Sequence, residues 1–142
     1  MRLLNISQCS RFMLLAVLAS FSLLSTAANA SEPAKVYELR TYHANEGKLP
    51  ALQARFREHT DAIFKRLGMK VVDYWVPLSE PEASNTLIYI LEHESEADAK
   101  QKWQTFFHDP EWVKAYENSI KDGKLVKGVD VVFMKKIHFN AN

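Results

Sequence analysis

Residues 36–43 read VYELRTYH, a run rich in Val, Tyr and Thr. β-branched and aromatic residues are enriched in strands, so this run predicts a β-strand. Successive side chains along a strand point to opposite faces, and one face therefore carries Val36, Glu38, Arg40 and Tyr42. A carboxylate, a guanidinium and a phenol follow one another along that face, about 7 Å apart, and form the first candidate site.

The rest of the chain divides into helices and strands at clear breaks. Leu49, Leu52, Phe56 and Leu67 recur at helical spacing and predict a helix over about 48–67, which Gly68 ends as a C-terminal cap. Strands are predicted over 69–76, 85–93 and 129–139, and a second helix over 95–120 with a break at HDPEW, residues 108–112. The 85–93 strand is apolar on both faces, which predicts a central position in the sheet.

This order, βαββαβ, predicts an α+β, ferredoxin-like fold: a four-stranded antiparallel sheet with two helices on one face. The opposite face of the sheet also carries apolar side chains and is left bare. A second copy of the chain would cover it, so we expect a homodimer in the form of a dimeric α/β barrel.

Residues 1–30 differ from the rest and predict a secretory signal peptide. Arg2 and Arg11 precede an apolar run at 12–24, and Ala28-Asn29-Ala30 supplies small residues for cleavage. The run reaches about 20 Å at ~1.5 Å per residue, short of the ~30 Å hydrocarbon core. We therefore expect no permanent membrane anchor after cleavage, a mature domain over 31–142, and a periplasmic or secreted protein. An organelle presequence or a retained anchor is the alternative, although a presequence should be amphipathic.

Composition excludes several classes of function. The 142 residues are 47% hydrophobic and 25% charged, with a formal charge of +1, so neither a disordered chain nor a nucleic-acid binder is expected. The one cysteine, Cys9, lies in the predicted signal, which leaves the mature chain without a thiol nucleophile or thiolate ligand. The histidines lack the i,i+2 or i,i+4 spacing of a metal site, so no metal and no cofactor are predicted.

The candidate site residues are assigned by chemistry. If the Glu38 face lines the interior of a dimeric barrel, Arg40 would bind an anionic substrate and Tyr42 would donate a proton. His59 lies beside the apolar stripe of the first helix and is a candidate base. The aromatic residues Tyr74, Trp75, Trp103 and Phe107 are candidates to stack on a flat ligand. The alternatives are a structural Glu38–Arg40 ion pair and aromatic residues that only form the core.

Three stretches together resemble the NIPSNAP family. They are YELRTY at 37–42 with Gly47-Lys48, the segment from Gly68 to Tyr74-Trp75, and 95–112 with DPEW at its end. The resemblance implies a ferredoxin-like protomer and a dimer whose sheets face each other, but it brings no defined activity. Similar dimeric barrels include cofactor-free monooxygenases, isomerases and haem enzymes, which is analogy at the level of the fold.

These observations predict an exported, homodimeric protein that binds a small hydrophobic or aromatic molecule in a barrel cavity. One alternative is a cofactor-independent monooxygenase or isomerase that uses Arg40, Tyr42 and His59. The other is a structural or interaction dimer without a ligand.

Overall fold

The computed structural model describes residues 34–139, so the predicted signal at 1–30 lies outside the described residues. The elements, in chain order, are β1 (Val36–Ala44), α1 (Leu49–Arg55), the π-helical turn η1 (Phe56–Thr60), α2 (Asp61–Arg66), β2 (Lys70–Trp75), the 3₁₀ turn η2 (Glu82–Ser84), β3 (Thr86–His93), α3 (Glu96–Phe107), α4 (Pro110–Ser119) and β4 (Val126–Lys135). No helix within this range is long and apolar enough to cross a membrane.

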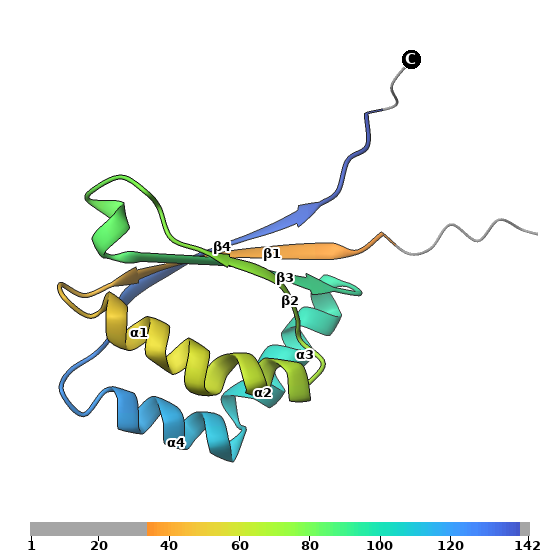
Figure 1. The fold of residues 1–142 in the computed structure, drawn as a ribbon. Coiled ribbons are helices and arrows are strands. Elements are labelled where there is room, and N and C mark those ends of the chain that lie inside the picture. Colours follow the sequence, from red (N-terminus) through yellow and green to blue (C-terminus); the bar gives the residue numbers. More distant parts are fainter. Residues whose placement is uncertain (1–33, 140–142) are drawn as a thin grey trace, which may run out of the picture. The chain divides into compact units, whose positions relative to one another are not determined.

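The four strands form one antiparallel sheet in the order β2-β3-β1-β4. This is the predicted ferredoxin-like arrangement, with the apolar strand β3 inside the sheet. Helices α1 to α4 form a layer on one face of the sheet, and the other face is uncovered (Figure 1).

Local sequence signals place the helix ends. The Ser95 side chain accepts a hydrogen bond from the Asp98 backbone N–H and caps α3. Asp109 caps α4 in the same way, and Pro110 follows at the first helical position, where its missing N–H costs little. The HDPEW segment therefore divides α3 from α4, as predicted. Gly68 ends α2 with a φ of 69°.

The fourth strand corrects the sequence prediction. The predicted range was 129–139, whereas β4 begins at Val126 and ends at Lys135. Its length follows from its partner, because Lys135 pairs with Val36, the first residue of β1, and Val126 pairs with Ala44, the last. Residues after Lys135 have no position on β1 left to pair with.

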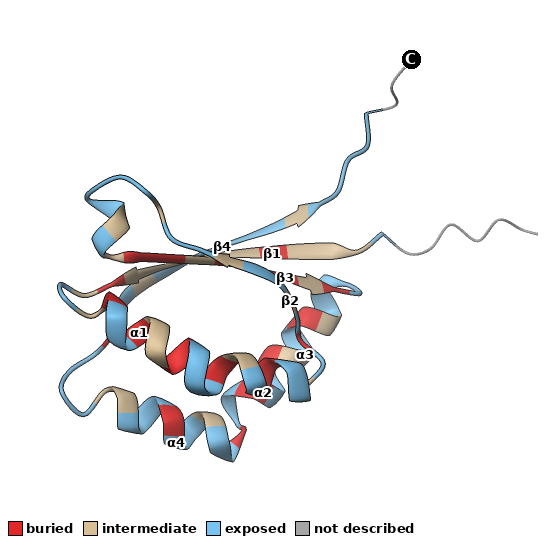
Figure 2. Cartoon of the chain, viewed as in Figure 1, coloured by how far each residue is buried: buried red, intermediate tan, exposed pale blue. Residues whose placement is uncertain are grey.

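The core lies between the sheet and the helices. Buried residues occupy β1, β3 and the helix faces that turn toward the sheet (Figure 2). Aromatic rings dominate this layer, and Phe56 packs its ring against Tyr42, Tyr74 and Tyr89 at centroid distances of 5.2–5.8 Å. On the outer face, Leu39, Ile88 and Ile90 are only half-buried, and Val132 is 51% exposed. The uncovered face is therefore apolar at its centre.

Candidate functional site

Glu38, in β1, is the centre of a buried polar network. Its side chain is 1% exposed and accepts three hydrogen bonds. Arg40 Nη1 donates to Oε1 at 2.7 Å, while His93 Nε2 and Trp103 Nε1 donate to Oε2 at 2.9 and 2.7 Å. Burial alone would raise the pKa of Glu38, but the hydrogen bonds from His93 and Trp103 and the charge of Arg40 outweigh it and lower that pKa. The carboxylate is therefore ionised and fully engaged.

Arg40 is paired on one side and stacked on the other. Its guanidinium carbon lies 4.1 Å from the ring centroid of Trp103, within the range of a cation–π contact. The roles predicted for Arg40 and Tyr42 depended on this face of β1 lining the interior of a dimeric barrel. That condition is not met, because Trp103 belongs to α3 and the row of Glu38, Arg40 and Tyr42 faces the helices of its own protomer.

A cavity of about 330 Å³ lies next to this network, between the sheet and α4. We name it the arginine cavity, because two arginines, Arg40 and Arg55, line it together with Tyr42. The rest of its wall consists mainly of aromatic and aliphatic residues: Phe107, Trp112, Tyr116, Ile120, Lys124, Leu125, Val126 and Val129. The cavity thus joins an apolar wall to a few converging donors.

Arg55 is the residue that the sequence prediction missed. It is the last residue of α1 and is only 5% exposed. Its Nη1 donates to Ser119 Oγ at 3.2 Å, and its guanidinium lies 5.2 Å from the ring centroid of Trp112. Burial lowers its pKa, yet a guanidinium stays charged in proteins. The available signal was its position, because Arg55 follows Leu52 by three residues and so lies on the apolar side of the helix.

Two tyrosine hydroxyls continue the polar row into the core. Tyr89 donates a hydrogen bond to the Tyr42 hydroxyl over 3.2 Å. Burial, together with the neighbouring Tyr42, raises the pKa of Tyr89 well above its ordinary value, so this phenol stays protonated. The arginine cavity therefore offers hydrogen-bond donors and positive charge, and the nearby carboxylate is already engaged.

His59 does not join this site. The sequence predicted partial burial beside the apolar stripe, but His59 is exposed and borders a different hollow between η1, α2 and α4. The cause is the π-helical turn, in which the Asp61 N–H bonds to the carbonyl of Phe56, five residues earlier. This wider turn moves the inward position by one residue, so Thr60 is buried instead.

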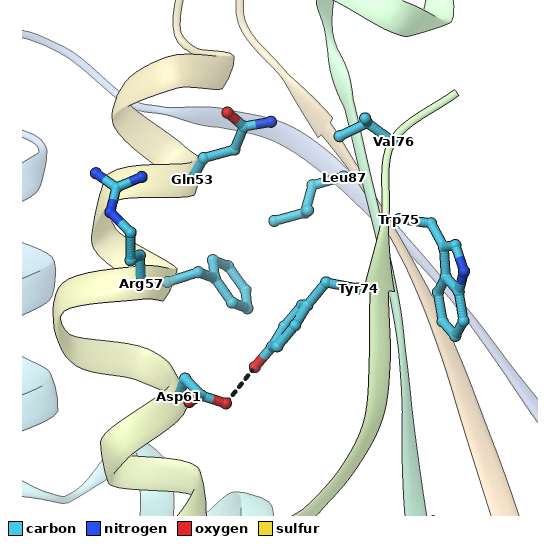
Figure 3. A pocket seen from close by; sticks show the side chains of 8 residues that line it. Gln53, Arg57, Asp61, Tyr74, Trp75, Val76 and Leu87 are labelled. Atoms are coloured by element: carbon cyan, nitrogen blue, oxygen red, sulfur yellow. Dashed lines mark hydrogen bonds between the residues drawn. The ribbon is translucent and has the colours of Figure 1, made fainter. Parts of the chain in front are cut away.

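A second cavity, of about 400 Å³, lies between β2 and the first helical segment (Figure 3). Tyr74 points from β2 toward Asp61 and donates a hydrogen bond to it over 3.1 Å. Burial and the charge of Asp61 raise the pKa of Tyr74. Asp61 also accepts a hydrogen bond from Lys65, so the Tyr74 hydroxyl and the Asp61 carboxylate already have hydrogen-bond partners within the chain. The Trp75 ring lies on the opposite side of the strand (Figure 3).

The structure thus separates the predicted aromatic residues. Phe107 lines the arginine cavity and is half-exposed, whereas Trp103 is buried beneath Arg40. Tyr74 and Trp75 border the second cavity. Residues 34–139 contain no group of three or more His, Cys, Asp or Glu side chains that could hold a metal ion.

Comparison with known proteins gives the family and the fold. A family profile described as NIPSNAP matches residues 37–141. A NIPSNAP-like domain protein from Burkholderia xenovorans superposes with a TM-score of 0.65 at 15% identity, over 78% of this chain and 91% of its own. A NIPSNAP family protein of unknown function from Agrobacterium tumefaciens does so with a TM-score of 0.62 at 25% identity, over 76% and 93%. No curated protein matches significantly.

Proposed function

The chain belongs to the NIPSNAP family, and we propose that it binds a small aromatic or apolar molecule in the arginine cavity. One observation carries this proposal: a cavity of about 330 Å³ whose mainly apolar wall is interrupted by Arg40, Tyr42 and Arg55. Ligand sites in proteins are concave and mostly apolar, with a few polar groups that orient the ligand, and range over ~300–1,000 Å³. The arginine cavity has both properties.

A cofactor-independent oxygenase or isomerase has less support. Such an enzyme needs a base within hydrogen-bond reach of its substrate, and His59, the predicted base, borders another hollow. Glu38 already accepts three hydrogen bonds, and Tyr89 stays protonated. The groups around the cavity favour binding over proton abstraction.

We also propose that the protein is exported and forms a homodimer. Export rests on the charged start, apolar run and Ala-Asn-Ala of residues 1–30. Dimerisation rests on the uncovered apolar sheet face, because monomeric proteins rarely expose large apolar patches. The ligand site would then lie within each protomer and not between the two sheets.

Native mass spectrometry of the protein purified from an exporting cell tests all three proposals together. The expected mass is that of two copies of residues 31–142 plus a few hundred daltons, with Ser31 at the N-terminus. In Val129→Trp the added mass should disappear, because an indole overfills the cavity that Val129 lines. Val113→Trp, on the exposed side of α4, should keep it. A bare wild-type dimer would favour a structural role, and an N-terminus at Met1 would contradict export.

The outer sheet face can be tested separately by the substitution Val132→Lys. Val132 pairs with Leu39 on the uncovered face and is 51% exposed, so the protomer should tolerate a lysine there. In a two-fold dimer that is docked through this face, the lysines of the two copies would bring like charges into an apolar interface. We expect the dimer to become a monomer in sedimentation velocity. Val113→Lys, on α4, is the control and should stay dimeric; two dimeric variants would contradict docking through this face.

A further inference from the structure

Among the described residues, the arginine cavity has one buried positive charge that no carboxylate neutralises. Arg40 is paired with Glu38 at 2.7 Å, so that pair is neutral. Arg55, which lines the same cavity, makes no ion pair with any carboxylate among residues 34–139. Lys124 also lines the cavity, but Lys124 is exposed, so water solvates its charge. The uncompensated buried charge is that of Arg55.

The surroundings of Arg55 leave its donors available. A guanidinium has five N–H donors, and the one hydrogen bond found for Arg55 within the described chain runs from Nη1 to Ser119 Oγ. Its buried Nε has no partner there. The rings of Trp112 and Tyr116 lie 5.2 and 5.6 Å from its guanidinium carbon. These rings favour the cation without accepting its hydrogen bonds.

An unpaired buried charge is strongly unfavourable unless a counter-charge reaches it. An arginine fork matches the two oxygens of a carboxylate, which it binds through parallel hydrogen bonds. Only one such charge is needed, because Glu38 already neutralises Arg40. A dianion would overcompensate the site, and a neutral molecule would leave Arg55 unpaired.

We propose that the ligand of the arginine cavity is an aromatic monocarboxylate whose carboxylate is bound by Arg55. This inference rests on the proposed function and names its ligand class. The aromatic body would lie against the apolar wall, which includes Phe107, Ile120 and Val129. Arg55 is then the residue that selects for charge. Arg40 is held by Glu38 and forms part of the cavity wall.

Isothermal titration calorimetry tests the inference with two probes of nearly the same shape, one with a charged polar group and one with a neutral polar group. The probes are naphthoate and the corresponding naphthamide, titrated into the purified protein. We expect naphthoate to bind about tenfold or more tightly than the amide, since a hydrogen bond to a charged group exceeds a neutral one by that order. Arg55→Gln should abolish this preference. Arg57→Gln, two residues away with a side chain that is 69% exposed, is the matched control and should retain it.

The outcomes separate this inference from the proposed function. Equal affinities for acid and amide in the wild-type protein would overturn the choice of a carboxylate and leave the ligand cavity standing. Failure of both probes to bind at millimolar concentration would overturn the cavity as a site for aromatic ligands, and the inference with it. Arg55→Lys keeps the charge without the fork and should keep part of the preference, so it serves as the test if Arg55→Gln does not fold.

Discussion

Replacing Glu38 with alanine should lower the free energy of unfolding by about 3–5 kcal/mol, the usual cost of removing one partner of a buried ion pair. The substitution would leave Arg40 charged, with a side chain that is only 13% exposed and no carboxylate beside it. It would also remove the acceptor for His93 Nε2 and Trp103 Nε1. Urea unfolding followed by tryptophan fluorescence, at constant protomer concentration, measures this loss.

Glu94→Ala is the matched control, because Glu94 forms its ion pair with Lys35 at the surface. Exposed pairs contribute less than about 1 kcal/mol, so this variant should unfold close to the wild-type midpoint. Equal losses for Glu38→Ala and Glu94→Ala would mean that Glu38 is not the centre of a buried network.

The same network gives stability a defined dependence on pH. The pKa of Glu38 in the folded protein lies below its ordinary value of 4.5. The unfolded chain therefore binds this proton more readily, and the stability from Glu38 is present above pH 4.5 and is lost as the pH falls through the lower, folded pKa. Glu38→Gln has no such titration. As the pH falls below 4.5, the stability of Glu38→Gln should therefore fall less than that of the wild-type protein.

Much of the fold follows from local signals in the sequence. The alternation in VYELRTYH correctly places Glu38, Arg40 and Tyr42 on one face of β1. Ser95, Asp109 and Gly68 mark helix ends by their own hydrogen bonds or backbone conformation, so each can be read from a few neighbouring residues.

Two of the features that the sequence prediction missed depend on distant partners, and the third is a local irregularity of the first helix. The bounds of β4 are set by the length of β1, from Val36 to Ala44, and not by its own residues. The π-helical turn shifts the inward register after Phe56, which an ideal helical period does not show, and His59 was therefore placed wrongly. The pairing of Glu38 with His93 and Trp103 joins residues that are 55 and 65 positions apart.

The site itself was predicted in part. Arg40 and Tyr42 line the arginine cavity, as does Phe107, so three of the predicted residues come together. Arg55 was not among the predicted residues; an arginine beside an apolar stripe usually extends its charged group into solvent. Its burial depends on α4, which supplies Trp112, Tyr116 and Ser119 around the guanidinium. The spacing within α1 places Arg55 on the apolar side of the helix, but it does not show that α4 encloses the guanidinium.

Phe64→Ala should lower the free energy of unfolding by about 3–5 kcal/mol, as large-to-small changes at buried phenylalanines do. The Phe64 side chain is 1% exposed. Its ring contacts Phe56, Tyr89, Trp103 and Phe106 at centroid distances of 6.4, 6.0, 5.6 and 4.9 Å. One side chain thus joins η1, β3 and α3, and its removal opens a cavity at the centre of the aromatic layer. Urea unfolding at constant protomer concentration measures the loss.

The cost of Phe64→Ala should lie at the upper end of that range if the contact between Arg66 and Asp109 keeps α2 from moving into the space. Arg66, two residues further on, donates two hydrogen bonds to Asp109 at 2.9 and 3.0 Å, which ties α2 to the start of α4. Phe139→Ala is the matched control, since Phe139 is 88% exposed and surface substitutions usually change stability by less than about 0.5 kcal/mol. The double variant Phe64→Ala, Arg66→Gln tests whether the Arg66–Asp109 contact restrains α2. If this variant loses less stability than the sum of the two single losses, the contact keeps α2 from moving into the cavity. If the two losses add, the contact has no such effect, and the lost ring contacts alone set the cost of the cavity.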